Sequence, residues 1–115
     1  MPGHNEHSDK TGSSLSEKFD VLSHPERRRL LVALDDHNPR DENEFVANSV
    51  AGDGDNLELL QLEMYHQHLP KLEEAGFIDY DRDSDAIMCG PRFEEIEPLI
   101  KLMNDHQDEL PDDWP

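Results

Sequence analysis

Residues 57–81, with the sequence LELLQLEMYHQHLPKLEEAGFIDYD, carry the strongest helical signal in the chain and decide its fold. Apolar residues recur there at i, i+3, i+7 and i+10, the spacing of one buried helix face: they are Leu62, Tyr65, Leu69 and Leu72. Pro70 cannot donate a hydrogen bond to the carbonyl of His66, so we expect a kink or a break there. Gly76 suits a left-handed cap, and the helix is expected to span about 57–75.

Two short β-prone runs follow this helix, at residues 77–81 and 86–89. The four residues between them, RDSD, are rich in the Asp and Ser that favour turns. The pattern therefore predicts a two-stranded hairpin over about 77–90. Cys89, near its end, is expected to be a small, half-buried hydrophobic residue.

Three shorter helices are expected ahead of the long one, each starting at a capping pair of Ser or Asp with Glu three residues later. The pairs are Ser14 with Glu17, Ser23 with Glu26, and Asp41 with Glu44, and a fourth pair, Asp55 with Glu58, precedes the long helix. The residues expected to face inward are Leu15, Phe19 and Leu22, then Leu30, Leu31 and Leu34, then Phe45, Val46 and Val50. The second helix is expected to end at Asp36 and the third at Gly52.

A last helix is expected after the hairpin, with a packing seam made of Phe93, Ile96, Ile100 and Met103. This seam is expected to pack on the first helix, on a second subunit, or on both. Pro98 means that the helix either starts late or bends.

These elements predict a mainly α chain with a small β-hairpin wing, an α+β fold class. Four helices, a hairpin and a helix follow the order of a winged helix-turn-helix domain, which would span residues 14–104. Residues 1–13 and the acidic segment 105–115 lack periodicity and are expected to be disordered tails.

Composition limits the possible functions of this chain of 115 residues, which has room for one domain. It has 28 Asp and Glu against 10 Lys and Arg, a net charge of −18 with His neutral. Disorder would explain such acidity, but the capped, periodic helices favour a folded protein. The surface resembles that of proteins from extreme halophiles, where dense carboxylates hold water and cations in molar salt.

The sequence lacks the motifs that mark several classes of protein. A single cysteine permits no internal disulfide, and the sequence has no signal-peptide pattern and no apolar run of membrane-spanning length, so a cytoplasmic protein is expected. We find no glycine-rich phosphate loop and no nucleophile elbow, so the chain is not expected to be an enzyme. His66 and His68, at i and i+2 on a helix, point to nearly opposite faces, so no metal or cofactor is predicted.

Two segments carry a family resemblance. FDVLSHPERRRLLVAL, residues 19–34, resembles the opening of ArsR-type transcriptional regulators, and HLPKLEEAGFIDYD, residues 68–81, resembles the end of their recognition helix running into the wing. The pattern from Leu15 to Met103 is similar to small haloarchaeal winged-helix domains of uncharacterised function.

This resemblance implies a DNA-binding transcriptional regulator of a halophilic archaeon, a homodimer joined through its terminal helices. The helix over about 57–75 would be its recognition helix and the hairpin over about 77–90 its wing. The residues implied in DNA contact are His66, Gln67, His68 and Lys71 on the helix, Arg82 on the wing, and Arg27 and Arg28, which would hold a phosphate. The dimer interface would be formed by Phe93, Ile96, Ile100 and Met103.

An alternative function is a winged-helix module that has lost DNA binding and engages another protein through its acidic surface and the Trp114 tail. The long helix favours this alternative, because its four Glu residues face a single Lys, a poor surface for phosphates. The placement of charge discriminates between the two hypotheses. Convergence of Arg27, Arg28, Lys71 and Arg82 on the hairpin-tip surface favours DNA, whereas scattering among carboxylates favours the interaction module.

We expect folding to require high salt. At about 1 M salt the Debye length falls to about 3 Å, so most of the self-repulsion at −18 is screened. Far-ultraviolet circular dichroism should show helix in molar KCl and its loss in dilute buffer. A spectrum that is the same in both solutions contradicts this prediction.

Overall fold

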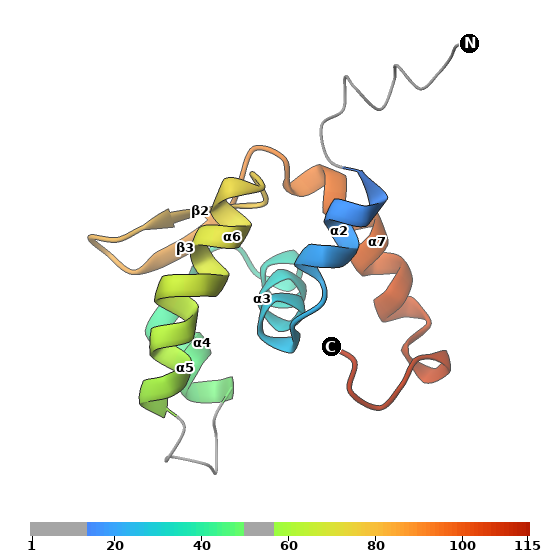
Figure 1. The fold of residues 1–115 in the computed structure, drawn as a ribbon, viewed down its shortest axis with the longest axis horizontal. Helices are drawn as coiled ribbons and strands as arrows, with labels where there is room; N and C mark the ends of the chain where they lie inside the picture. The colour runs from blue at the N-terminus through green and yellow to red at the C-terminus, as the bar shows by residue number, and fades with distance from the viewer. Residues whose placement is uncertain (1–13, 50–56) are drawn as a thin grey trace.

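The computed structural model describes residues 14–49 and 57–115, which form a mostly helical α+β fold with one small antiparallel sheet (Figure 1). The helices are α2 (Leu15–Val21), α3 (Pro25–Asp36), α4 (Glu42–Ser49), α5 (Leu57–Glu63), α6 (Leu69–Glu74) and α7 (Phe93–Asp105), with a π-helical turn η2 (Met64–His68) and a 3-10 turn η3 (Gln107–Glu109). The strands are β1 (Arg40–Asp41), β2 (Ile78–Asp81) and β3 (Ala86–Cys89), in the spatial order β1-β3-β2. The α+β class and the hairpin are confirmed. The expectations on Val50, Gly52 and Asp55 lie outside the described residues.

Two of the expected capping pairs are confirmed by hydrogen bonds. The Glu17 amide donates to Ser14 Oγ at 3.1 Å, and the Glu44 amide donates to Asp41 Oδ1 at 3.0 Å. The pair at Ser23 was predicted wrongly, because the N-cap of α3 is His24 and makes no side-chain cap bond. The Ser23 hydroxyl donates instead to the Asp20 carbonyl at 2.6 Å, which closes the turn after α2.

The long helix, which we define as α5, η2 and α6 together, passes Pro70 without a break because its register changes there. The Leu69 amide donates to the Met64 carbonyl, five residues back, in the wider spacing of a π turn. In a regular α-helix three turns take about 11 residues. In the long helix the buried positions are spaced four residues apart, so three turns take 12 residues. These buried residues are Leu60, Met64, His68 and Leu72, with Leu69 beside them. Leu62 and Tyr65 are therefore exposed, and their predicted place in the core was wrong.

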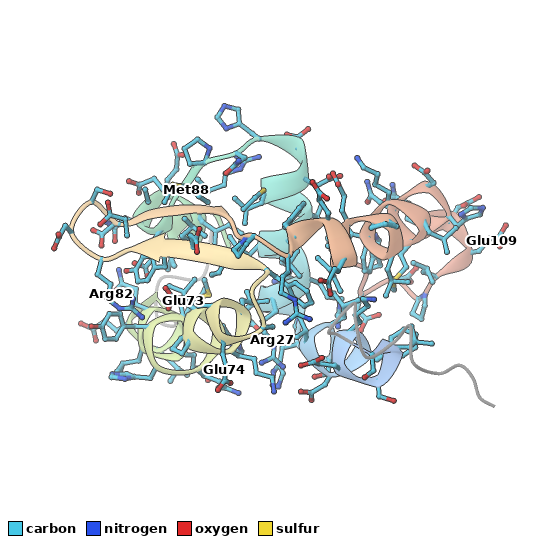
Figure 2. All side chains as sticks on the ribbon, turned by 90° about the horizontal axis from the view of Figure 1, so that it is seen from above. Arg27, Glu73, Glu74, Arg82, Met88 and Glu109 are labelled. Atoms are coloured by element: carbon cyan, nitrogen blue, oxygen red, sulfur yellow. The ribbon has the colours of Figure 1, made fainter. Side chains whose placement is uncertain are left out.

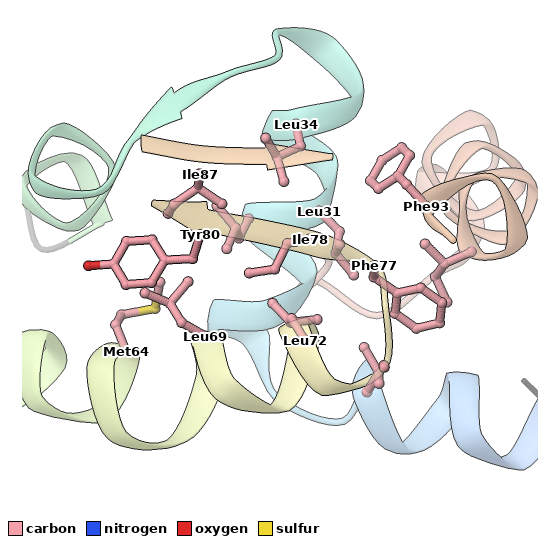
Figure 3. Close-up of a cluster of buried hydrophobic side chains, with 14 of the residues drawn as sticks. Leu31, Leu34, Met64, Leu69, Leu72, Phe77, Ile78, Tyr80, Ile87 and Phe93 are labelled. Carbon is pink, nitrogen blue, oxygen red and sulfur yellow. The ribbon is translucent and has the colours of Figure 1, made fainter. Parts of the chain in front are cut away.

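The core lies between the long helix, the sheet and α3. Figure 3 shows Met64, Leu69 and Leu72 of the long helix pointing toward the strands that carry Ile78 and Ile87. The predicted inward face of α3 is confirmed, since Leu30, Leu31 and Leu34 are all buried. The hairpin is also tied to α4, because the Tyr80 hydroxyl donates to Glu42 Oε1 at 2.5 Å. Burial and this nearby carboxylate raise the pKa of Tyr80.

α2 and the C-terminal segment lie on the side of α3 opposite the hairpin (Figure 1). Only the last residue of α2, Val21, and the adjacent Leu22 are buried; Leu15 and Phe19 are exposed, so most of the predicted α2 stripe was wrong. Residues 105–115, expected to be a disordered tail, fold back in the structure, and Trp114 Nε1 donates to Asn104 Oδ1 at 3.2 Å. The apolar side chains in this segment account for the difference. Leu110 and Trp114 of this segment line a shallow pocket. The same pocket is lined by Phe19 of α2, by Leu22 directly after it, and by Met103 of α7.

Gly90 permits the hairpin to approach the end of the long helix. A Cβ atom at this position would lie 2.5 Å from the Gly76 carbonyl oxygen and 2.7 Å from the Ile78 nitrogen, and both are backbone atoms that cannot swing away. We expect Gly90→Ala to lower the free energy of unfolding by about 1–3 kcal/mol, the usual cost of overpacking. Urea denaturation in molar KCl measures the effect, with Pro91→Ala at the exposed neighbouring position as control. Equal midpoints for the two variants would contradict the close approach.

Candidate functional site

The cations implied on the recognition helix and wing are both paired with carboxylates. Lys71 Nζ lies 2.6 Å from Asp20 Oδ2, and this contact lowers the pKa of Asp20. An Arg82 guanidinium nitrogen lies 3.1 Å from Glu73 Oε1 and donates to it, which raises the pKa of Arg82. Figure 2 shows Arg82 and Glu73 in the space between the hairpin and the long helix. These charges are therefore largely neutralised within the chain.

Arg27 and Arg28 have structural contacts in place of the implied phosphate contact. Arg27 is 4% exposed and donates to the Asp20 carbonyl and to Ser23 Oγ, both at 3.2 Å. Burial lowers its pKa. Arg28 donates to the Leu22 carbonyl at 2.8 Å and lies 3.8 Å from Asp113 Oδ2 in the folded-back tail. The placement of Arg27 does not support the implied phosphate contact, because its guanidinium is buried and closes the turn between α2 and α3.

The π turn separates the three polar residues that the resemblance assigned to base contact. His66 and Gln67 are exposed, whereas His68 is 2% exposed and lies against His24, with ring centroids 5.2 Å apart. The burial of His68 does not support the DNA contact that the resemblance implied for it. Burial, and secondarily the charge of Arg27, lower the pKa of His68.

The long helix presents apolar side chains to solvent. Leu59 and Leu62 are each 55% exposed and Tyr65 is 47% exposed, at a spacing of three residues along the helix. Exposed or half-exposed polar residues flank them: Glu58, Gln61, Glu63 and His66. We call these seven residues the outer face. Sequence reasoning missed it because LELLQL holds more apolar residues than one helix face can bury.

The seam predicted as a dimer interface is largely used inside the chain. Phe93, Ile96 and Ile100 are buried, and Met103 packs half-buried against the same core. Because α7 contacts α3, these side chains complete the core of one protomer and are not a free surface. Leu102 is the large exposed hydrophobic residue of α7.

Comparison with known proteins yields one match. The family described as "Domain of unknown function (DUF7344)" matches residues 19–88. No curated protein and no solved structure matches the chain. No helix within residues 14–49 and 57–115 is long and apolar enough to cross a membrane.

Arg27 and its neighbour Arg29 offer a matched test of the structural role of Arg27. We expect Arg27→Ala to lower the free energy of unfolding by about 1–3 kcal/mol, because it removes hydrogen bonds from a charged, buried donor. Arg29 is exposed, and Arg29→Ala should stay within about 0.5 kcal/mol of the unsubstituted protein. Urea unfolding in molar KCl measures both. Equal stability of the two variants would show that Arg27 is dispensable to the fold.

Proposed function

We propose that this chain, which belongs to the DUF7344 family, is a protein-interaction module on a winged-helix framework that binds its partner through the outer face of the long helix. The order α3, β1, α4, long helix, β2, β3 supports this framework, since a winged helix places its second helix-turn-helix helix directly before the hairpin. The pairing of β1 with β3, which completes a three-stranded sheet, is a further point in favour.

The observation that carries the proposal is the character of the outer face. DNA-binding surfaces draw much of their affinity from Lys and Arg at phosphates. Here the helix that would enter the groove offers Leu59, Leu62 and Tyr65, whereas Lys71 and Arg82 are held by carboxylates. The placement of four cations discriminates between the two hypotheses, and these cations do not converge on one surface. Arg27 is buried, whereas Arg28, Lys71 and Arg82 lie beside carboxylates. By that criterion the geometry favours protein binding.

Charge complementarity indicates the chemistry of the partner. Apolar anchors at three-residue spacing are typical of helix-in-groove recognition, and the anchors of the outer face lie beside Glu58 and Glu63. A partner with an apolar groove or stripe bordered by Lys or Arg complements both features. A second copy of the outer face is disfavoured, because it would bring like charges together.

DNA binding in transcriptional regulation is the second candidate, favoured by the exposure of His66 and Gln67 on the long helix. About five phosphate contacts would lose more than four decades of affinity between roughly 0.2 and 2 M salt. A regulator working in the cytoplasm of a halophilic archaeon would therefore rely on base edges, and Gln67 can pair with adenine. A homodimer of this kind would have to use exposed residues such as Leu15, Phe19 and Leu102. We propose no catalytic role.

A display library of helical peptides, selected against the full chain in 2 M KCl, tests the leading proposal. We expect enrichment of peptides with apolar residues at i, i+3 or i+4, and i+7, flanked by Lys or Arg. Joint replacement of Leu59 and Leu62 by Ser should weaken their binding at least about tenfold, the usual range for loss of central apolar anchors. Leu102→Ser is the matched control, since Leu102 is 57% exposed on a different helix.

The same protein, offered random-sequence duplex DNA in 2–3 M KCl with folding verified, separates the two candidates. The interaction proposal expects no enriched sequence. An enriched sequence whose binding is lost in Gln67→Ala, together with peptide binding that ignores Leu59 and Leu62, would overturn the leading proposal in favour of DNA.

A further inference from the structure

Three potential metal ligands from two distant segments converge beside the π turn. His24, Glu26 and His68 each offer one ligand atom, and these atoms lie within 4.8 Å of one another. His68 Nε2 is 3.8 Å from Glu26 Oε1. Figure 2 shows Arg27, which follows Glu26 in α3, between the end of the long helix and α2.

The backbone explains this convergence. His24 is the N-cap of α3, in extended conformation, and Glu26 lies in the first turn of the same helix. His68 ends the π turn, whose wider register directs its side chain into the protein instead of outward. The cluster therefore depends on the same register change that exposes the outer face.

Within residues 14–49 and 57–115, no hydrogen bond explains the burial of His68. Among the residues that the structure describes, its Nδ1 is buried without a hydrogen-bond partner, and the 3.8 Å between Nε2 and Glu26 is too long for a hydrogen bond. Buried polar groups in folded proteins nearly always have a partner. An imidazole that is 2% exposed, beside a second imidazole and a carboxylate, points to a ligand that the described part of the chain does not supply.

We propose that His24, Glu26 and His68 bind a divalent transition-metal ion such as Zn²⁺, which links the start of α3 to the π turn of the long helix. Two imidazoles and one carboxylate are a ligand set that zinc uses, with water in the fourth position. His24 and Glu26 are only half-buried, so solvent can supply both the ion and that water. Mg²⁺ and Ca²⁺ prefer oxygen ligands and suit this set poorly.

The three ligand atoms must move slightly closer together when the ion binds. Bonds of about 2.0–2.1 Å place the donors of a tetrahedral zinc site roughly 3.4 Å apart. The separation between His68 Nε2 and Glu26 Oε1 is 3.8 Å, and no separation among the three ligand atoms exceeds 4.8 Å, so each must shorten by about 1.4 Å at most. Side-chain rotation of His24 and Glu26 can cover this change because both are only half-buried. The charges around the site partly cancel, since the Arg27 guanidinium opposes a cation and the Glu26 carboxylate attracts it. Affinity should therefore depend strongly on Glu26.

Zn²⁺ and Co²⁺ titrations of the full chain in molar KCl test this site without DNA or a partner protein, so their outcome is independent of the proposed function. We expect one equivalent of Zn²⁺ in calorimetry and the intense visible absorption of tetrahedral Co²⁺. Molar KCl and a millimolar excess of Mg²⁺ suppress loose binding to the many surface carboxylates. Metal binding should persist under both conditions.

Variants at the half-buried ligands identify the site, because replacing the buried His68 risks unfolding. His24→Ala and Glu26→Gln should each weaken Zn²⁺ binding at least about tenfold. A tenfold loss is already usual when a residue that only supports a metal ligand is replaced, so loss of a ligand itself should cost at least as much. His66→Ala, at an exposed position two residues from His68, is the matched control and should bind as the unsubstituted chain does. The double variant His4→Ala, His7→Ala tests the other histidines near the chain start. Circular dichroism verifies folding of each variant.

The proposal is overturned by absence of an equivalent of Zn²⁺ bound to folded protein, or by displacement of that ion by Mg²⁺. It is equally overturned if the histidine controls lose as much affinity as His24→Ala and Glu26→Gln.

Discussion

The register of the long helix is the constraint on which the rest of the structure depends, and Pro70 is at its centre. A proline inside an α-helix removes one backbone hydrogen bond and clashes with the preceding turn. The chain avoids a break by widening that turn, so that the Leu69 amide bonds to the Met64 carbonyl. The change directs Met64 and His68 into the protein and leaves Leu62 and Tyr65 in solvent. Both the core contact with the sheet and the character of the exposed face follow from this one turn.

Sequence reasoning succeeded where the determining interactions are local. The Ser14 and Asp41 caps, the leucines of α3 and the hairpin each depend on residues a few positions apart, and all are present. It failed where a register or a distant contact decides. A regular 3.6-residue period cannot anticipate a π turn, so it placed Tyr65 inside and His68 outside. The pairing of β1 with β3 joins residues more than 40 positions apart, and two residues of strand carry no pattern of their own.

The candidate site was predicted by residue type, and the structure shows why residue type was insufficient. A run of three arginines suggests a phosphate site, yet Arg27 lies inside and bonds to the Asp20 carbonyl, while Arg28 reaches the C-terminal segment. With 28 acidic residues against 10 basic ones, most cations find a carboxylate nearby. Such crowding occurs between α3 and α7, where Asp35 raises the pKa of Glu97 and Lys101 lies 3.0 Å from Asp35 Oδ2. Neutralisation within the chain thus competes directly with binding of phosphates.

The π turn also connects the two proposed binding functions, because it carries His68 on its inner side and Tyr65 and His66 on its outer side. An ion held by His68 and the start of α3 would favour the wide register over a regular helix. A partner on the outer face would select the same register, in which Tyr65 is exposed. Two ligands that favour one conformation strengthen each other's binding by the same factor. That factor is limited by how much of the protein adopts the regular register before either ligand binds. Pro70 already keeps the population of the regular register small. Coupling between metal and partner should therefore be weak in this chain, with the ion acting chiefly on the stability of the turn.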